Sequence, residues 1–426
     1  MNGTNIDRRL VLKGLMATTA GGLLAPQAAR CDEPGDWARV RAAFTPSPHI
    51  LNLNNAGVSP QPKIVQEAMV RAYRFANELP DVNMWEVLDG DRERIKEKLS
   101  VIAGCMPREI AFNRNSTEGL STAIFGIDLA PGDEVIVSDW DYPAMRHAWA
   151  LRAKRHGIVI KPVSFDPMAE DDEIVSQYRM AVTPRTKVMH LTHMVHYTGR
   201  VLPVERLCAV AKDAGDIQTI VDAAQSFAQL PLSFERIGCD YLAVSLHKWL
   251  CAPFGTGMLI VRQSRFDALW PLLGPFTGEP HGVDKIDGEN LGTYSSPAEH
   301  AIGTAVDFHT AIGTERIHDR LRYLSRYWIE RASDVRGFTL HTPMSHPETA
   351  AITLFSINGL DAGTIEKRLR REHNIHVLTR NIHGLSGIRV SPHVYTNEAD
   401  LERFAAALHH VARTERAKSS RASGDV

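Results

Sequence analysis

One lysine lies in a segment that otherwise carries almost no charge. Lys248 belongs to the stretch SLHKWLCAPFGTG (residues 245–257), which follows DYLAV (240–244) and contains Pro and Gly. Lysine is among the residues least often fully buried. Desolvation would lower its pKa, and a partly deprotonated amine can condense with an aldehyde. An isolated lysine at the end of a strand more often extends its ammonium group to water, so the chemistry of Lys248 depends on other residues.

Two further features carry chemistry that would match such a lysine. Asp222 ends an apolar run 26 residues before Lys248 (248 − 222), and Gln225 follows it. A carboxylate there could pair with a protonated ring nitrogen, although a strand-end Asp is also a common turn former. Ser116 and Thr117 open a predicted helix directly after a strand. Hydroxyls and free backbone N–H groups at that position suit a phosphate, and they equally suit a simple helix cap.

Arg389 provides a fourth feature, in SGIRVSPHVYTNEADLERF between a predicted strand and the last helix. A guanidinium can bind a substrate carboxylate through two parallel N–H groups. Taken alone, an arginine at this place is usually a surface residue. The order of the four features along the chain changes this interpretation.

That order resembles the class V aminotransferase family of pyridoxal-phosphate (PLP) enzymes, which includes cysteine desulfurases, kynureninase and isopenicillin N epimerase. The most similar run is VDAAQSFAQLPLSFERIGCDYLAVSLHKWLCAPFGTGMLIVR, residues 221–262. LNLNNAGVSP near the start and IRVSPHVYTNEADL near the end extend the resemblance over essentially the whole mature chain. It implies PLP as the cofactor and an α/β PLP-dependent transferase fold (fold type I).

The resemblance also implies roles for individual residues. Lys248 would form the Schiff base with PLP, Asp222 would pair with the pyridine nitrogen, and Gln225 would contact the phenolic oxygen. The other implied cofactor contacts are Ser116, Thr117, Ser245 and His247 around the phosphate and Tyr142 stacked on the ring.

For the substrate and the partner subunit, the resemblance points to other positions. Arg389 would hold the substrate carboxylate, with Asn55 and His193 at the same site. His196 would act in catalysis with Lys248 and Tyr142, but it stands where many members have Asn, and a structural histidine remains the alternative. Thr293 would reach a phosphate in the partner subunit, which implies a homodimer with shared active sites.

The reaction type stays open at the level of sequence. No cysteine follows Cys251, so the mobile cysteine that a desulfurase needs before Arg389 is missing. The features LNNAG and TGRVLPV resemble the isopenicillin N epimerase-like branch most. We therefore expect an enzyme that acts on an amino acid or amine-bearing metabolite through a Schiff base and a Cα carbanion, by epimerisation, racemisation or β-elimination. Transamination, a desulfurase-like protein without the cysteine, and a non-catalytic PLP-binding scaffold are the alternatives.

A second proton donor or acceptor would be needed for epimerisation. Lys248 can serve one face of the substrate; for the other face the sequence offers Tyr142, His193 or His196 without distinguishing between them.

The elements that position these residues follow from apolar periodicity. Strand-like runs without alternation follow one another with helices between them, which predicts a mostly parallel sheet covered on both faces. We expect a large PLP-binding α/β domain over 51–296 and a smaller α+β domain over 297–412. The smaller domain is predicted to begin with a long helical stretch near 297–333 and to have two strands, in AAITLFSI and SGIRVSP. Residues 31–50 are predicted as a linker and 413–426 as a disordered tail.

Composition and the N-terminal segment limit the partners and the cellular location that we expect. The chain has 426 residues, 44% of them hydrophobic and 23% charged, with a formal net charge of −2. We therefore expect no nucleic-acid partner and no stable membrane association. The five cysteines form no ligand cluster, so no metal site is expected. Arg8 and Arg9 precede a short, weakly apolar run, which predicts a twin-arginine signal over residues 1–30 and a periplasmic or secreted protein.

Overall fold

The computed structural model describes residues 34–274, 282–287 and 292–422. The predicted export signal lies outside these residues. The described residues from Trp37 onward form one compact unit. A helix, α2 (Pro34–Ala42), occupies part of the segment 31–50 that we predicted as a linker.

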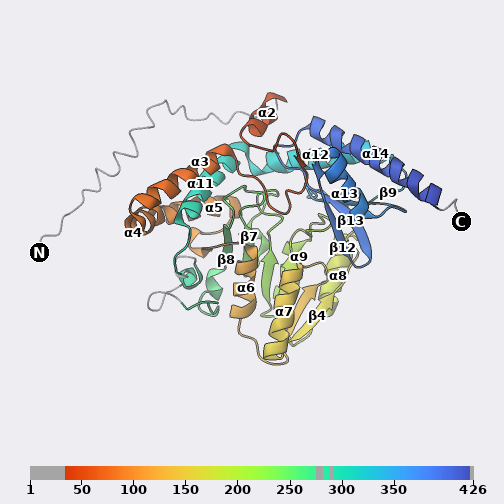
Figure 1. Cartoon of the computed structure of the whole chain (residues 1–426). Helices are drawn as coiled ribbons and strands as arrows, with labels where there is room; N and C mark the ends of the chain where they lie inside the picture. The colour runs from red at the N-terminus through yellow and green to blue at the C-terminus, as the bar shows by residue number, and fades with distance from the viewer. Residues whose placement is uncertain (1–33, 275–281, 288–291, 423–426) are drawn as a thin grey trace, which may run out of the picture. The chain divides into compact units, whose positions relative to one another are not determined.

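A seven-stranded sheet forms the centre of the molecule (Figure 1). Its strands, in spatial order, are β2 (Ile110–Asn113), β8 (Gly257–Val261), β7 (Tyr241–Ser245), β6 (Gln218–Asp222), β5 (Thr186–Thr192), β3 (Glu134–Ser138) and β4 (Val159–Val163). The five strands from β7 to β4 are parallel, and β8 runs antiparallel to both of its neighbours. The predicted α/β fold with a mostly parallel sheet is confirmed.

The sheet is buried on both faces because helices cover both of them. Val135 and Val137 of β3 point to one side, where they pack with Trp149 of α7, whereas Ile136 between them points to the other side. This alternation is the two-residue period of a strand. The helices that follow the strands of this sheet are α6 (Ser116–Gly126), α7 (Pro143–His156), α8 (Asp171–Ala181), α9 (Val204–Asp213) and α10 (Phe234–Ile237).

A second, antiparallel sheet lies in the C-terminal part of the chain. Its strands, in spatial order, are β12 (Leu378–Ile382), β13 (Leu385–Val390), β10 (Thr353–Ile357) and β9 (Phe338–Leu340). A separate core around Trp328 and Phe404 joins this sheet to α12 (Thr314–Ala332), α13 (Ala362–His373) and α14 (Glu398–Ala422). The short strand β1 (Leu51–Asn52) pairs in parallel with β11 (Ile375–His376), so the segment that precedes the large sheet contacts this region.

Two expectations for the C-terminal region need correction. The long helical stretch expected near 297–333 is divided into α11 (Ser296–Ile312) and α12 by Gly313, whose φ of 93° is unfavourable for other residues. The tail predicted as disordered from residue 413 continues α14 to Ala422. Arg416 donates to the carbonyls of Arg336 and Asn358, and these contacts hold the added turns against the small sheet.

The remaining elements lie mainly between residues 63 and 109. They are α3 (Lys63–Glu78), α4 (Pro80–Val82), a π-helical turn η1 (Asn83–Leu88), α5 (Arg92–Ala103) and the 3₁₀ turns η2 (Asp89–Asp91), η3 (Pro107–Glu109), η4 (Gln263–Arg265) and η5 (Gly282–Ile286). Figure 1 shows α3 alongside α11. In the described ranges, none of the helices combines the length and the apolar character needed to cross a bilayer.

Candidate active site

Three polar residues end three neighbouring strands of the large sheet. Thr192, Asp222 and Ser245 are the last residues of β5, β6 and β7. Thr192 is paired directly with Asp222 in the parallel register, and β7 is the next strand. In open α/β sheets, ligands bind in the crevice outside the carboxyl ends of the strands. All three residues line a cavity of about 260 Å³ at this edge.

Most of the residues predicted for the site lie around this cavity. The residues that both the sequence predicted and the structure places in its wall are Ser116, Thr117, Tyr142, His196, Asp222, Gln225, Ser245, His247, Lys248 and Arg389. They come from segments more than 270 residues apart in the chain (389 − 116). The cavity is therefore a product of the tertiary fold and joins the large sheet to the small one.

Lys248 lies in the tight turn that follows β7. Its backbone N–H faces the carbonyl of Ser245, and Cys251, with a φ of 58°, closes the turn on the carbonyl of Lys248. The pKa of Lys248 is lowered to about 8, mainly by burial and in smaller part by the charges of Arg389 and Arg380, while Asp222 opposes the shift. An uncharged amine is therefore accessible near neutral pH, which is the property that an amine nucleophile needs.

Asp222 and Gln225 occupy the turn after β6. Burial raises the pKa of Asp222, opposed by the backbone N–H of Ala224, which donates to its carboxylate at 2.9 Å, and by the nearby Lys248. The side chain of Gln225 is held by two contacts: its amide donates to the carbonyl of Ala56 at 2.9 Å, and its oxygen accepts from Trp249 at 3.1 Å. Both side chains are thus fixed in the cavity wall before any ligand binds.

The N-terminus of α6 opens onto the same cavity. Asn115 caps the helix through its side-chain oxygen, which accepts from the N–H of Glu118 at 3.0 Å. The N–H of Ser116 donates to the hydroxyl of Ser245 at 3.0 Å, and the two hydroxyls lie 2.9 Å apart. The helix end approaches β8 so closely that a Cβ on Gly257 would lie 2.7 Å from the nitrogen of Asn115. The hydroxyls of Ser116 and Thr117, together with the helix dipole, make this end a favourable anion site.

Arg389 reaches the cavity from β13 of the small sheet. One of its Nη atoms donates to the carbonyl of His196 at 2.9 Å and the other to the side-chain oxygen of Asn54 at 2.7 Å. Burial and the neighbouring Arg380 lower the pKa of Arg389 to about 9. Both acceptors are neutral, so the guanidinium is oriented and keeps its charge uncompensated for an anionic group.

Three predicted residues do not line the cavity. Asn55 is fully buried behind it, where its side chain bonds the carbonyl of Ser391 and the hydroxyl of Tyr395; its neighbour Asn54 takes the position beside Arg389 instead. His193 lies outside because Met194 and His196, at alternate positions, face the cavity. Thr293 is exposed, away from the cavity lining of its own chain.

Tyr142 and His196 form a ring pair on the cavity wall, with centroids 5.1 Å apart and the rings nearly perpendicular. Tyr142 precedes α7 and remains 44% exposed. Burial, together with the positive charges of Arg389, Arg380 and Lys248, lowers the pKa of His196 well below its usual value. His196 is therefore a neutral imidazole at pH 7, and Tyr142 is the member of the pair with an O–H to donate.

Sequence reasoning missed three polar residues in the wall, Asn115, Thr192 and Arg380. The hydroxyl of Thr192 donates to the buried Asp141 at 2.7 Å, and burial raises the pKa of Asp141 to about 7. Arg380 lies in β12, in the segment LTRNI, whose mixed pattern did not predict a strand. Residues 378–382 show no alternation of apolar and polar side chains, so no local signal indicated a strand there.

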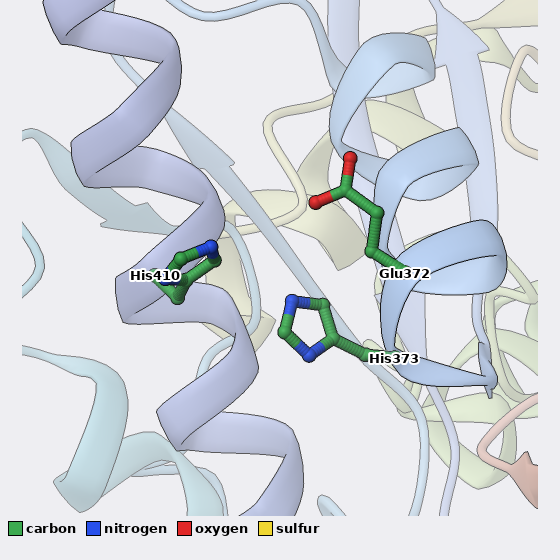
Figure 2. A group of neighbouring side chains, drawn as sticks. All are labelled: Glu372, His373 and His410. Carbon is green, nitrogen blue, oxygen red and sulfur yellow. The ribbon is translucent and has the colours of Figure 1, made fainter.

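A separate group of metal-binding residue types lies on the surface of the C-terminal part. Glu372 and His373 end α13, and His410 faces them from α14 (Figure 2). Their ligand atoms lie within 4.8 Å of one another. Both oxygens of Glu372 already accept from Arg368, at 2.7 and 2.6 Å, and Arg403 donates to the carbonyl of His373. This cationic surrounding disfavours a divalent ion, and we assign the group no metal.

Comparison with known proteins agrees with the site geometry. A family model described as "Aminotransferase class-V" matches residues 51–404. The chain is 30% identical to isopenicillin N epimerase of Amycolatopsis lactamdurans, covering 88% of this chain and 99% of that protein. It is 26% identical to a probable cysteine desulfurase of Synechocystis sp., covering 85% and 91%.

Solved structures have the same fold. A C-DES variant with glycine covalently linked to its PLP cofactor superimposes with a TM-score of 0.79 at 22% identity, covering 87% of this chain and 98% of that one. The complex of the cystine C–S lyase C-DES with its product cysteine persulfide has a TM-score of 0.78 at 23% identity, covering 85% and 98%.

The donor set of the cavity fits PLP. Lys248 with its lowered pKa suits the aldehyde, and the carboxylate of Asp222 suits a protonated ring nitrogen. The hydroxyls and the dipole at the start of α6 suit the phosphate. With the match of the family model over most of its length, this chain belongs to the class-V aminotransferase family of PLP-dependent enzymes.

Proposed function

We propose that the protein is an isopenicillin N epimerase-like PLP enzyme that moves the Cα proton of an amino acid or amine-bearing metabolite, by epimerisation or racemisation. The observation that carries this proposal is the cavity itself. It joins Lys248, whose pKa is lowered to about 8, with Asp222, Arg389 and a second proton-bearing side chain, Tyr142. When bound, PLP would supply an electron sink that acidifies the Cα–H of an attached amine.

The residues of this chain divide the work between binding and proton transfer. The guanidinium of Arg389, held by Asn54 and the carbonyl of His196, binds and orients the substrate carboxylate. Asp222 stabilises positive charge on a ring nitrogen, since no other carboxylate among the described residues lines the cavity. Lys248, uncharged in about a tenth of molecules at pH 7, takes the proton at Cα.

Tyr142 returns a proton from the other side in this proposal. It comes from the start of α7, whereas Lys248 follows β7, so the two groups approach the cavity from different elements. His196 is too weak a base to carry a proton at neutral pH, and it positions the Tyr142 ring by edge-to-face contact. His193, the third candidate, does not reach the cavity.

A β-elimination of the lyase type is the second candidate. It requires the same Cα deprotonation and no thiol. A fold likeness to a cystine C–S lyase supports keeping it. The persulfide-forming desulfurase reaction is disfavoured because none of the described cysteines lines the cavity and none follows Cys251 in the sequence.

The experiment uses the visible absorption of the purified protein before and after borohydride, with Lys248→Ala beside it and Lys212→Ala, an exposed lysine of α9, as the matched control. We expect wild type and the control to be yellow and to be bleached, and Lys248→Ala to lack the bleachable band. Incubation with amino acids in D₂O then separates the candidates: deuterium at Cα with loss of chirality supports epimerisation, and a keto acid with ammonia supports elimination. If the wild-type protein is colourless and added PLP does not produce the absorption band, the proposal of a PLP enzyme is contradicted.

Active sites shared between two protomers are also part of this proposal. Thr293 is exposed in the single chain and would reach a phosphate only across a homodimer. If so, a mixture of inactive Lys248→Ala and Thr293→Val protomers would regain activity by forming one intact site per mixed dimer. Absence of any recovery after verified subunit exchange would contradict shared sites.

A further inference from the structure

Two arginines stand side by side on one face of the small sheet. In the antiparallel pairing of β12 with β13, Arg380 is opposite Gly387 and Leu378 is opposite Arg389. Arg380 and Arg389 are therefore diagonal neighbours, and such neighbours share a face at about 7–8 Å. Both line the cavity that contains Lys248. Gly387 has no side chain, so nothing on β13 covers Arg380 from the opposite position.

Arg380 has no anionic partner in the part of the chain that the structure describes. No carboxylate lies within 4.0 Å of its guanidinium there, and its Nε is buried without a hydrogen-bond partner. Glu366, an acid that acts on it electrostatically, accepts from the N–H of Thr379. A partly buried cation without a partner is costly, and desolvation correspondingly lowers the pKa of Arg380.

The charges around the cavity are unequal. Lys248, Arg380 and Arg389 are cationic, and Asp222 is the single carboxylate among the described lining residues. In the proposed function, Asp222 serves a ring nitrogen, the start of α6 serves a phosphate, and Arg389 serves the substrate carboxylate. These assignments leave the Arg380 guanidinium uncompensated beside the place where the substrate lies.

We propose that Arg380 binds a second carboxylate of the substrate, so that the natural substrate is an amino dicarboxylate: an amino acid or amino-acid derivative with a distal acidic group. The inference rests on the proposed function for the position of the amine and the first carboxylate. It adds the chemical class of the substrate. A substrate with an uncharged side chain would leave Arg380 as an unpaired cation in the occupied site, and a substrate with a basic side chain would be repelled by Arg380.

The test measures binding of amine-free ligands to the holoprotein by calorimetry. The probes are succinate, glutarate and adipate, each beside the monocarboxylate of equal carbon number. The proteins are wild type, Arg380→Gln, Arg380→Lys and, as a matched control, Arg146→Gln, which removes a nearby positive charge that belongs to a pair with Asp139 outside the cavity.

We expect wild type to bind one dicarboxylate about 10- to 100-fold more tightly than its monocarboxylate partner. Arg380→Gln should abolish this preference and leave monocarboxylate binding unchanged, Arg380→Lys should retain part of it, and Arg146→Gln should retain all of it. Equal weakening of both ligand types in Arg380→Gln, or no preference in wild type, overturns the proposal. If Arg380→Gln fails to fold, the Arg380→Lys variant gives the answer. Because lysine keeps the positive charge at this position, this variant must still bind the dicarboxylate more tightly than the monocarboxylate.

A second readout separates this inference from the proposed function. The cofactor absorbance is followed while L-glutamate, L-2-aminoadipate and their analogues with uncharged side chains, L-norvaline and L-norleucine, are added. A spectrum that changes equally with charged and uncharged amino acids contradicts the dicarboxylate site alone. If no amino acid changes the spectrum but the protein still binds dicarboxylates through Arg380, the proposed enzymatic function is contradicted and the dicarboxylate site is supported.

Discussion

Ser116 at the start of α6 and Ser245 at the end of β7 are joined by two contacts, from the N–H of Ser116 to the Ser245 hydroxyl at 3.0 Å and between the two hydroxyls at 2.9 Å. The pair connects the anion-binding end of a helix to the strand that leads into Lys248 three residues later. A ligand bound at the helix end is thereby held in a fixed relation to the lysine.

Ser245→Ala should therefore weaken PLP binding by about tenfold, and it should lower the free energy of unfolding by about 1–3 kcal/mol because the buried N–H of Ser116 loses its acceptor. Fluorescence titration of the apoprotein with PLP and urea unfolding measure the two effects. Ser176→Ala, the same change on the exposed side of α8, is the control and should alter neither. Unchanged PLP affinity in Ser245→Ala would place the phosphate elsewhere.

Asp222→Asn should leave the cofactor bound and slow exchange of the Cα proton roughly 100-fold or more, because a neutral amide no longer stabilises a charged ring nitrogen. Proton exchange of a bound amino acid in D₂O, followed by NMR, gives the rate. Asp222→Glu should recover part of it, since the charge is kept. Full exchange in Asp222→Asn would show that the carboxylate is structural.

The reactivity of Lys248 should depend on pH with a midpoint near 8. Its pKa lies below the ordinary value, so the reactive uncharged amine increases tenfold per pH unit below 8 and becomes constant above it. The rate at which apoprotein condenses with PLP, measured by stopped-flow absorbance, should follow this curve. Because the negative charge of Asp222 raises the pKa of Lys248, Asp222→Asn should move the midpoint to lower pH. A midpoint near that of an exposed lysine would disprove the desolvation.

Asn54 and Asn55 should give opposite phenotypes. Asn54→Ala removes the acceptor that orients Arg389 and should weaken carboxylate binding about 3- to 10-fold with little change in stability. Asn55→Ala removes buried contacts to Ser391 and Tyr395 and should cost about 1–3 kcal/mol of stability. Calorimetry with a monocarboxylate and thermal unfolding distinguish them. The reverse pattern would restore Asn55 as the substrate residue.

Export through the twin-arginine route is a proposal that depends on Arg8 and Arg9. A reporter fused to residues 1–35 should appear outside the cytoplasm, and changing both arginines to lysine should retain it inside. A reporter that stays in the cytoplasm with the native residues would contradict the proposal and would place the substrate inside the cell.

Several features of the fold could be predicted from local sequence. Apolar runs predicted β2 to β7, and their lack of alternation correctly indicated a sheet covered on both faces. β9 and β12 were missed because their exposure alternates weakly and their polar residues resemble loop sequence. The extension of α14 was missed because a polar helix without an apolar stripe has no periodic signal; side-chain contacts such as those of Arg416 hold it in place.

The sequence by itself determined the chemistry of the site: a lysine and a carboxylate after predicted strands, hydroxyls at the start of a predicted helix, and an arginine much farther along the chain. The tertiary structure decided which neighbours complete it. The choice of Asn54 over Asn55 beside Arg389, and of His196 over His193 in the cavity wall, depends on turns in which side-chain directions follow no periodic signal. Arg380 enters only through the register between β12 and β13, and the contact of a small sheet with a large one is encoded in no local pattern.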